Sequence, residues 1–324
     1  MARAWIAVLA FALALGGAMA PGSAQEDYPS APISFLVPFP PGGGNDTLAR
    51  VVTAKASELI GGTIVVENRP GAGGTVAGKL AADAKPDGYT LLQGNIAHAI
   101  SMSMYKTPSF DLLKDLDAIT LFGRTSYVLA IRKDLPVNSV EEFIAYAKER
   151  PGELNYGSSG VGGHSHLAME IFKAKAGVDI VHIPYQGAAP SILDLVGGRL
   201  DCALIVMSQA LPLIADNQVK ALAVSSLERS ELAPNLPTIA ESGVPGYEAS
   251  AWYGVMAPAG TPKPIADKLY EGFHAAVNDP AIKEKLTTMG FEVVGNTPDE
   301  FKAYLQSEVA TWAEAVKLAG ITPE

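Results

Sequence analysis

The sequence has few of the residues that would support disulfide bonding or nucleic-acid binding. Its 324 residues include one cysteine and 7% aromatic residues. A single cysteine excludes an internal disulfide, and Cys202 lies in an apolar run, which favours a small buried core residue. The formal net charge is −10, and no cluster of Lys and Arg interrupts the acidic excess. This charge argues against nucleic acid and against an anionic membrane surface as partners.

Motifs for nucleophilic catalysis and for metal binding are also missing. There is no G-x-S-x-G nucleophile elbow, and the cysteine lies in a strand-like run rather than at a helix start. His164 and His166 stand close together, but zinc requires three or four ligands and no further ligand motif accompanies them. We therefore expect no metal and no cofactor, and we favour a binding protein over an enzyme.

A long apolar run occurs at the N-terminus, where Arg3 precedes residues 4–15 and small residues follow as far as Ala24. This pattern is typical of a cleavable secretory signal, predicted as residues 1–24, and the apolar core is too short for a comfortable membrane span. No later segment approaches a span. Export without disulfides fits a soluble protein of the bacterial periplasm.

Strand-like and helix-like runs alternate along the remaining chain. This alternation predicts an α/β fold with parallel-rich sheets and with ligands at the carboxyl ends of the strands. The length suggests roughly two domains. The expected strands are 33–37, 63–66, 89–93, 127–131, 154–156, 180–183, 202–206, 220–224 and 251–256; the expected helices are 47–60, 75–82, 139–148, 165–175, one with Pro190 in its first turn, 264–277, 280–289 and 297–318.

Two glycine-rich loops, residues 38–46 and 157–165, each lie between an apolar run and a helix-like run. A glycine-rich turn that enters a helix exposes unpaired backbone amides at the positive end of the helix dipole, which suits a carboxylate or a phosphate. Neither loop is a P-loop, and both miss the GxGxxG dinucleotide fingerprint, at Thr47 and at Ser165. We expect Asp46 to cap the first helix. The two loops suggest two half-sites that close on one anion.

Short motifs along the whole mature chain carry a resemblance to a known protein family. They include Pro38-Phe39-x-Pro41-Gly42-Gly43 in the first loop and occur in a fixed order. Together they resemble the Bug (TctC-type) family, the extracytoplasmic solute-binding proteins of tripartite tricarboxylate transporters. The motifs are residues 38–46, 66–74, 86–91, 182–185, 197–201, 237–243 and 250–254.

The resemblance implies a two-lobed periplasmic-binding-protein fold (type II-like) with two interdomain crossings and a ligand cleft between the lobes. We place the crossings near Thr125 and Ser250, so that 25–124 and 251–324 form domain 1 and 125–250 form domain 2. The resemblance also implies a small carboxylate ligand, often a dicarboxylate, that is held by backbone amides of both loops and by ordered water. The implied partners are a large and a small integral membrane protein, and we expect a monomer.

The predicted ligand-binding residues combine the loops with the resemblance. Relatives commonly have Thr where this chain has His164, Lys where it has Gln186, and an Asp-Asn pair where it has Ile205-Val206. These differences predict a ligand with a less polar body, such as an aromatic acid or a longer-chain diacid. The full set is Phe39, Pro41, Gly42, Gly43, Gly44, Asn95, Ala97, Ser158, Gly160, Gly162, Gly163, His164, Tyr185, Gln186, Val206 and Met207.

Two other functions share part of this pattern. A ligand sensor that presents its closed form to a signalling receptor would use the same site with a different partner. An enzyme on a similar two-lobed fold would need a titrating catalytic group, which the motifs do not support. The leading prediction is a carboxylate clasp whose ligand shifts an equilibrium between open and closed forms.

Overall fold

The computed structural model describes residues 28–42 and 44–323, so the predicted signal segment 1–24 and Gly43 lie outside the described residues. The strands are β1 (Ile33–Val37), β2 (Ile64–Asn68), β3 (Thr90–Asn95), β4 (Leu116–Arg132), β5 (Asn155–Ser158), β6 (Val181–Pro184), β7 (Cys202–Val206), β8 (Val219–Val224), β9 (Ser250–Pro258) and β10 (Glu292–Val293). The helices are α1 (Gly44–Ile60), the 3-10 helix η1 (Ala72–Gly74), α2 (Thr75–Ala82), α3 (Ile96–Met104), α4 (Val140–Lys148), α5 (His164–Ala176), α6 (Ala188–Val196), α7 (Met207–Ala215), α8 (Lys263–Asn278), α9 (Pro280–Thr288) and α10 (Pro298–Leu318).

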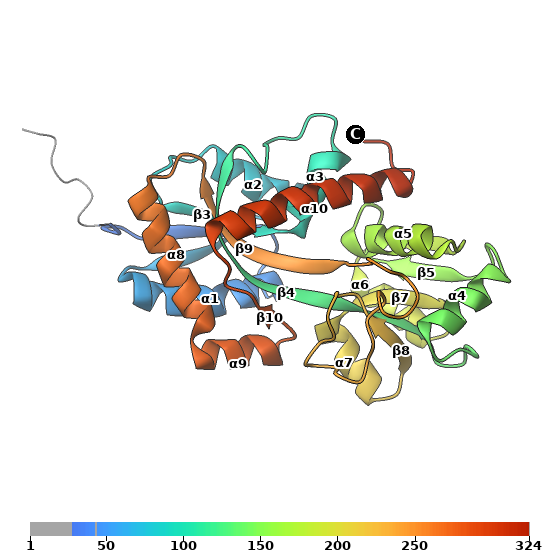
Figure 1. The fold of residues 1–324 in the computed structure, drawn as a ribbon. Helices are drawn as coiled ribbons and strands as arrows, with labels where there is room; N and C mark the ends of the chain where they lie inside the picture. The colour runs from blue at the N-terminus through green and yellow to red at the C-terminus, as the bar shows by residue number, and fades with distance from the viewer. Residues whose placement is uncertain (1–27, 43, 324) are drawn as a thin grey trace, which may run out of the picture.

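The strands of the described chain form one mixed sheet, and the predicted α/β fold is confirmed (Figure 1). The strand order is β2-β1-β3-β9-β4-β7-β5-β6, with β10 and β8 also paired to β4. Five segments are absent from the predicted elements: η1, α3, α7, β10 and the first part of β4. In the residues that the structure describes, none of the helices is both long enough and apolar enough to cross a membrane.

The long strand β4 joins two halves of the sheet. It pairs with β9 as far as Ser126, which lies opposite Ser250, and it pairs with β7 from Tyr127, which lies opposite Val206. We call β1, β2, β3, β10 and the adjoining parts of β4 and β9 the first half, and β5 to β8 with the rest of β4 the second half. The strands change partners near the predicted domain crossings, and the assignment of two domains remains a proposal.

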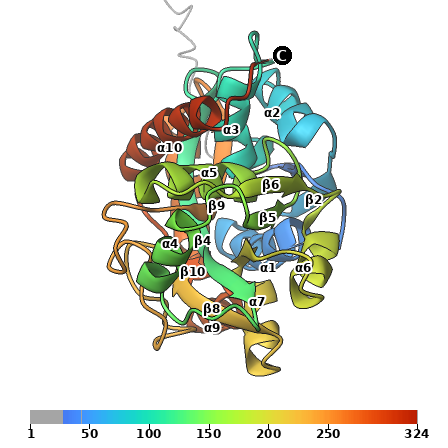
Figure 2. The same cartoon turned by 90° about the vertical axis from the view of Figure 1, so that its right-hand side faces the viewer.

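Helices cover both faces of the sheet. In the first half, α1 and α8 pack on one face and α2, α3 and α10 on the other (Figure 1). Helix α10 continues from the first half onto α5, so it spans both halves. In the second half, α5 lies above β5 and β6, whereas α6 and α7 lie below them (Figure 2). The carboxyl ends of β1 and β5 therefore lead into helices in different halves of the molecule.

Aromatic side chains anchor α10 against the sheet. Trp252 in β9 and Phe301 and Trp312 in α10 are almost completely buried. Burial of each such side chain stabilises the fold by roughly 1.5–3 kcal/mol. Both indole N–H groups donate to Oε2 of Glu308, at 2.7 Å from Trp252 and 2.9 Å from Trp312. This carboxylate therefore couples α10 to a strand that passes between the two halves.

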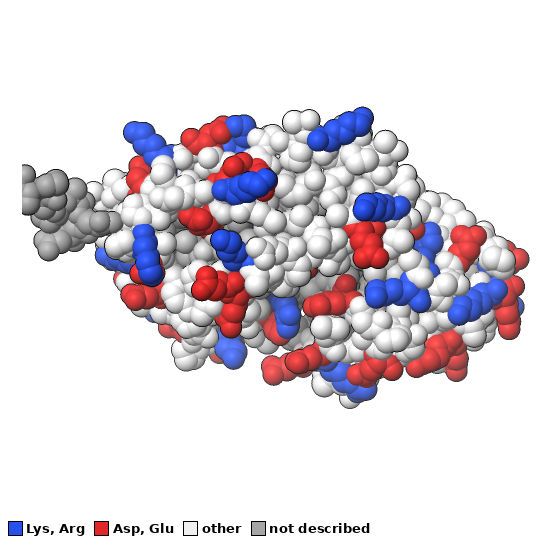
Figure 3. Space-filling model, turned by 45° about the horizontal axis from the view of Figure 1, so that its top comes forward, with Lys and Arg blue, Asp and Glu red and all other residues white. Residues whose placement is uncertain are grey.

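The charged side chains are distributed without a dominant sign on the face that Figure 3 displays. Lys and Arg alternate there with Asp and Glu, consistent with the many exposed ion pairs between neighbouring residues. Exposed pairs of this kind contribute little to stability because water screens them. The visible surface offers no broad basic patch that would attract an anion from a distance.

Candidate functional site

The first glycine-rich loop is held by a buried carboxylate at the start of α1. Asp46 is 4% exposed and accepts hydrogen bonds from the Gly42 amide at 2.9 Å and from Nε of Arg50 at 3.1 Å. The hydrogen bond from Arg50, with those from Gly42 and Asn68, lowers the pKa of Asp46 to about 2. Asp46 therefore stays ionised at any physiological pH and fixes the turn that leads into α1.

Asn68, the last residue of β2, holds the same loop from the neighbouring strand. Its Nδ2 donates to the Phe39 carbonyl and to Oδ1 of Asp46, both at 3.0 Å. Phe39 is partly buried, whereas Pro41, Gly42 and Gly44 are exposed. The tip of the first loop is thus exposed, whereas contacts with Asp46 of α1 and Asn68 of β2 hold its backbone in place.

The start of α3 lies next to this loop and involves the predicted site residues Asn95 and Ala97. Oδ1 of Asn95 accepts from the Ala97 amide at 3.0 Å, and Nδ2 of Asn95 donates to Oδ1 of Asn45 at 3.4 Å. The Asn95 amide donates to Nδ1 of His98 at 3.1 Å, so the proton of this ring lies on Nε2, 3.2 Å from the Gly74 carbonyl. Burial lowers the pKa of His98 to about 4, which keeps the ring neutral.

The second glycine-rich loop uses much of its own hydrogen-bonding capacity. The Gly160 amide donates to Oγ of Ser158 at 3.1 Å, and the Gly163 amide donates to the Gly160 carbonyl at 3.2 Å. The Gly162 amide donates to Nδ1 of His166, also at 3.1 Å. The amides of these three predicted glycines are therefore engaged in shaping the loop.

The free amides lie one step further along, in the first turn of α5. Gly163 is the N-cap and provides no side-chain cap. Within the described residues, the backbone amides of His164, Ser165 and His166 have no hydrogen-bond partner. Unpaired amides at a helix start carry the positive end of the helix dipole and suit an anionic oxygen.

Three stacked aromatic rings pack next to the second loop. The rings of His166 and His182 have their centroids 3.9 Å apart, and Tyr156 stacks on His182 at 4.9 Å. Nε2 of His182 lies 2.6 Å from Oγ of Ser158, and burial lowers the pKa of His182 to about 4. No group of three metal-ligating side chains occurs among the residues that the structure describes. These histidines brace the loop as neutral rings.

A cavity of about 100 Å³ lies beside the second loop. It brings together three predicted residues, Ser158, His164 and Val206. The other predicted residues of this half lie elsewhere. Tyr185 directs its hydroxyl to Asp194 at 2.6 Å, Gln186 is exposed, and Met207 is 1% exposed in the core.

Tyr127 and Gln209 also line this cavity and are absent from the predicted set. Tyr127 becomes a neighbour of His164 through the folding of β4, with ring centroids 5.0 Å apart, so no local sequence pattern indicates the contact. The described residues of the first half do not line the cavity.

Helix α3 connects the two loops. Its N-cap contacts α1 through Asn45, and Met104 at its other end packs against Gly162 of the second loop. A side chain at Gly162 would place its Cβ 2.5 Å from Cε of Met104, and the positive φ of 72° also favours glycine. Nine helical residues span roughly 13 Å, which separates these two contacts.

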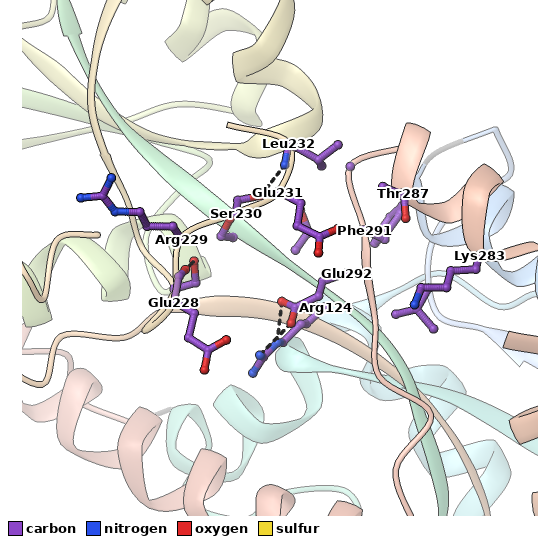
Figure 4. Close-up of a pocket in the computed structure, with 15 residues that line it drawn as sticks. Arg124, Glu228, Arg229, Ser230, Glu231, Leu232, Lys283, Thr287, Phe291 and Glu292 are labelled. Carbon is purple, nitrogen blue, oxygen red and sulfur yellow. Dashed lines mark hydrogen bonds and ion pairs between the residues drawn. The ribbon is translucent and has the colours of Figure 1, made fainter. Parts of the chain in front are cut away.

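A larger cavity, of about 260 Å³, lies between β10, α9 and the loop after β8 (Figure 4). Its lining mixes both charge signs and includes none of the predicted site residues. Arg124, the prominent cation there, already donates to both carboxylate oxygens of Glu292, at 2.9 and 3.0 Å. The cavity beside the second loop is therefore the better candidate site.

The chain is similar to known proteins over nearly its whole length. The family described as the tripartite tricarboxylate transporter family receptor (TctC) matches residues 48–321. Protein BugT of Bordetella pertussis is 35% identical over 317 residues, which cover 97% of this chain and 97% of that protein. R. palustris Rpa4515 with adipate is 36% identical, with a TM-score of 0.78, over 92% of this chain and 100% of that chain.

A second solved structure extends the similarity. MatC (Rpa3494) from Rhodopseudomonas palustris with bound malate is 31% identical, with a TM-score of 0.74, over 89% of this chain and 100% of that chain. The chain belongs to the TctC (Bug) family of tripartite tricarboxylate transporter receptors.

Proposed function

We propose that the protein is a periplasmic solute-binding protein that captures a small organic carboxylate. It delivers the ligand to the large and small integral membrane subunits of a tripartite tricarboxylate-type transporter. The receptor family supports this function, as do the adipate and the malate bound by two similar proteins. The observation that carries the proposal is the set of unpaired amides in the first turn of α5, beside the cavity at His164.

One carboxylate of the ligand is bound by these amides, and the first loop closes over it from the other half. Closure is required because the cavity at His164 has no lining from the described first-half residues. A rotation about the strands β4 and β9 would bring the loops together, and the ligand would shift the equilibrium toward the closed form. The protein acts as a monomer that carries no cofactor.

A thermal-shift screen of the mature protein against organic acids tests the proposal. A ligand that binds only the folded state stabilises it by about 2.7 kcal/mol at 100 times Kd. We expect at least one small carboxylate to raise Tm by several degrees, and its primary amide to have little effect because the amide lacks the anionic oxygens. If no acid raises Tm, the proposal is contradicted. Conversion of the bound acid to a product, monitored by NMR, would also contradict it.

A further inference from the structure

The cavity at His164 has aliphatic walls beside uncharged polar residues, which include Ser158, Ser159, Ser165, Ser191 and Gln209. Ile192 from α6 and Leu204, Ile205 and Val206 from β7 contribute to its lining. Its described lining contains no Lys, Arg, Asp or Glu. A volume of about 100 Å³ is well above the roughly 10–15 Å³ that a single water molecule needs. The cavity therefore has room for one end of a small ligand.

Two residues of this lining each have a polar side-chain atom that is buried without a hydrogen-bond partner. The atoms are Oη of Tyr127 and Nε2 of His164. Tyr127 is 1% exposed, and its ring lies against the His164 ring at a centroid distance of 5.0 Å. A buried polar group that lacks a partner costs roughly 1–3 kcal/mol, so two such atoms in the lining residues of one cavity indicate a missing hydrogen-bonding group.

The two atoms suit an uncharged group. Burial lowers the pKa of His164 to about 4, so its imidazole is neutral near pH 7 and provides one donor or one acceptor. The Tyr127 hydroxyl can donate or accept. A ligand hydroxyl has the matching chemistry, because it can donate one hydrogen bond and accept another. A carboxylate would instead bring a full charge into a cavity whose described lining holds no cation, which costs several kcal/mol unless the carboxylate is fully hydrogen-bonded.

We propose that this cavity selects acids whose far end is an uncharged hydroxyl on an apolar chain, bonded to both Tyr127 Oη and His164 Nε2. The inference rests on the proposed function, because the carboxylate of the same ligand occupies the amides of α5. It narrows the ligand from carboxylates in general to hydroxy monocarboxylates. A second carboxylate at the far end is disfavoured.

Three acids of equal chain length test this selectivity. They are 6-hydroxyhexanoate, hexanoate and adipate, which end in a hydroxyl, a methyl and a carboxylate. Isothermal titration should give 6-hydroxyhexanoate the lowest Kd, at least about tenfold below that of adipate. One hydrogen bond is worth about 1 kcal/mol, so with two such bonds we also expect roughly thirtyfold tighter binding than for hexanoate.

Two variants test which side chains form hydrogen bonds with the ligand hydroxyl. Tyr127→Phe should remove most of the preference for 6-hydroxyhexanoate over hexanoate and leave the Kd of hexanoate within about twofold. His164→Leu should have the same effect. Tyr146→Phe is the matched control, because Tyr146 lies on α4, outside this cavity, with its ring against Arg150.

The outcomes separate the inference from the proposed function. Tightest binding of adipate, or an equal loss of both monoacids in Tyr127→Phe, would overturn the inference and leave the carboxylate-binding function intact. Binding of other acids but none of the three would do the same. Failure of every acid in the thermal-shift screen would overturn the proposed function itself.

Discussion

The two glycine-rich loops look alike in sequence, but different interactions hold them. The first depends on ions, because Asp46 is ion-paired with Arg50 at 2.9 Å and is bonded to Asn68. The second depends on neutral groups, namely Ser158 and the stacked rings of His166 and His182. Loops of similar composition can therefore respond differently to charge and to pH, since glycine allows the backbone path but does not stabilise it.

The largest effect is expected from the ionic brace of the first loop. Asp46→Asn leaves Arg50 unpaired and removes a charged acceptor, and a hydrogen bond to a charged group is worth about 1.5–3 kcal/mol. Ligand affinity, measured by titration, should fall about 10- to 100-fold. Asp267→Asn removes the exposed pair with Lys263 and is the matched control. Equal affinities of Asp46→Asn and the control would show that the first loop does not need its brace.

A smaller effect is expected in the second loop. Ser158→Ala removes contacts with His182 and with the Gly160 amide, which are neutral hydrogen bonds of about 1 kcal/mol each. Ligand affinity should fall about fivefold to tenfold, with little change in Tm. Ser307→Ala, which removes one exposed bond to the Tyr304 carbonyl, serves as the control. A loss as large as that of Asp46→Asn would break the proposed difference between the loops.

Acidification should destabilise the second loop and leave the stability of the first loop unchanged. Burial lowers the pKa of His182 to about 4, so the unfolded loop binds protons more readily than the folded loop. The folded loop therefore loses stability as the pH falls from about 6.5 toward 4. Asp46, with a pKa of about 2, keeps its charge throughout this range. Affinity should fall about threefold between pH 7.5 and 5.5, where a carboxylate ligand is still mostly ionised, and His182→Gln should flatten the profile. If ligand affinity depends on pH equally in this variant and in the unmodified protein, His182 is not the group responsible.

The smallest effect on affinity is expected at Glu308, which lies in a cavity between α5 and α10. Burial raises the pKa of Glu308 to about 7, so the stability from its protonated form is present below about pH 4.5 and is lost as pH rises through 7. Glu308→Gln should raise Tm at pH 8, leave it nearly unchanged at pH 5 and leave ligand affinity within about twofold. A lower Tm at pH 8 would show that the ionised carboxylate stabilises the fold.

Much of the fold could be predicted because most elements have a regular apolar period with glycine or proline at their ends. The strand at Cys202–Val206 and the helix at Thr75–Ala82 match their predicted ranges. Helix α7 was not predictable in the same way, because Pro212 lies inside it and proline usually ends a helix. Helix α3 follows β3 directly, without a glycine or proline between them, so its start has no breaker signal.

The candidate site could be proposed from the sequence where neighbouring residues form it, as in the two loops. Its supports were not, because they come from distant segments. Tyr156 and His182 meet through the parallel register of β5 and β6, and Tyr127 and Val206 meet through the pairing of β4 and β7. Strand register depends on the whole sheet, so a single sequence does not reveal these contacts.

The position of Tyr127 in β4 has a kinetic consequence. Tyr127 is the first residue of β4 to pair with β7, and its amide donates to Oγ of Ser225 at 2.7 Å. A ligand bonded to its hydroxyl, as proposed above, would contact the strand that both halves share, close to the axis about which they would rotate. Acids that differ at their far end should be captured at similar rates but released at different ones. The residence time on the closed form would then decide which acid reaches the membrane.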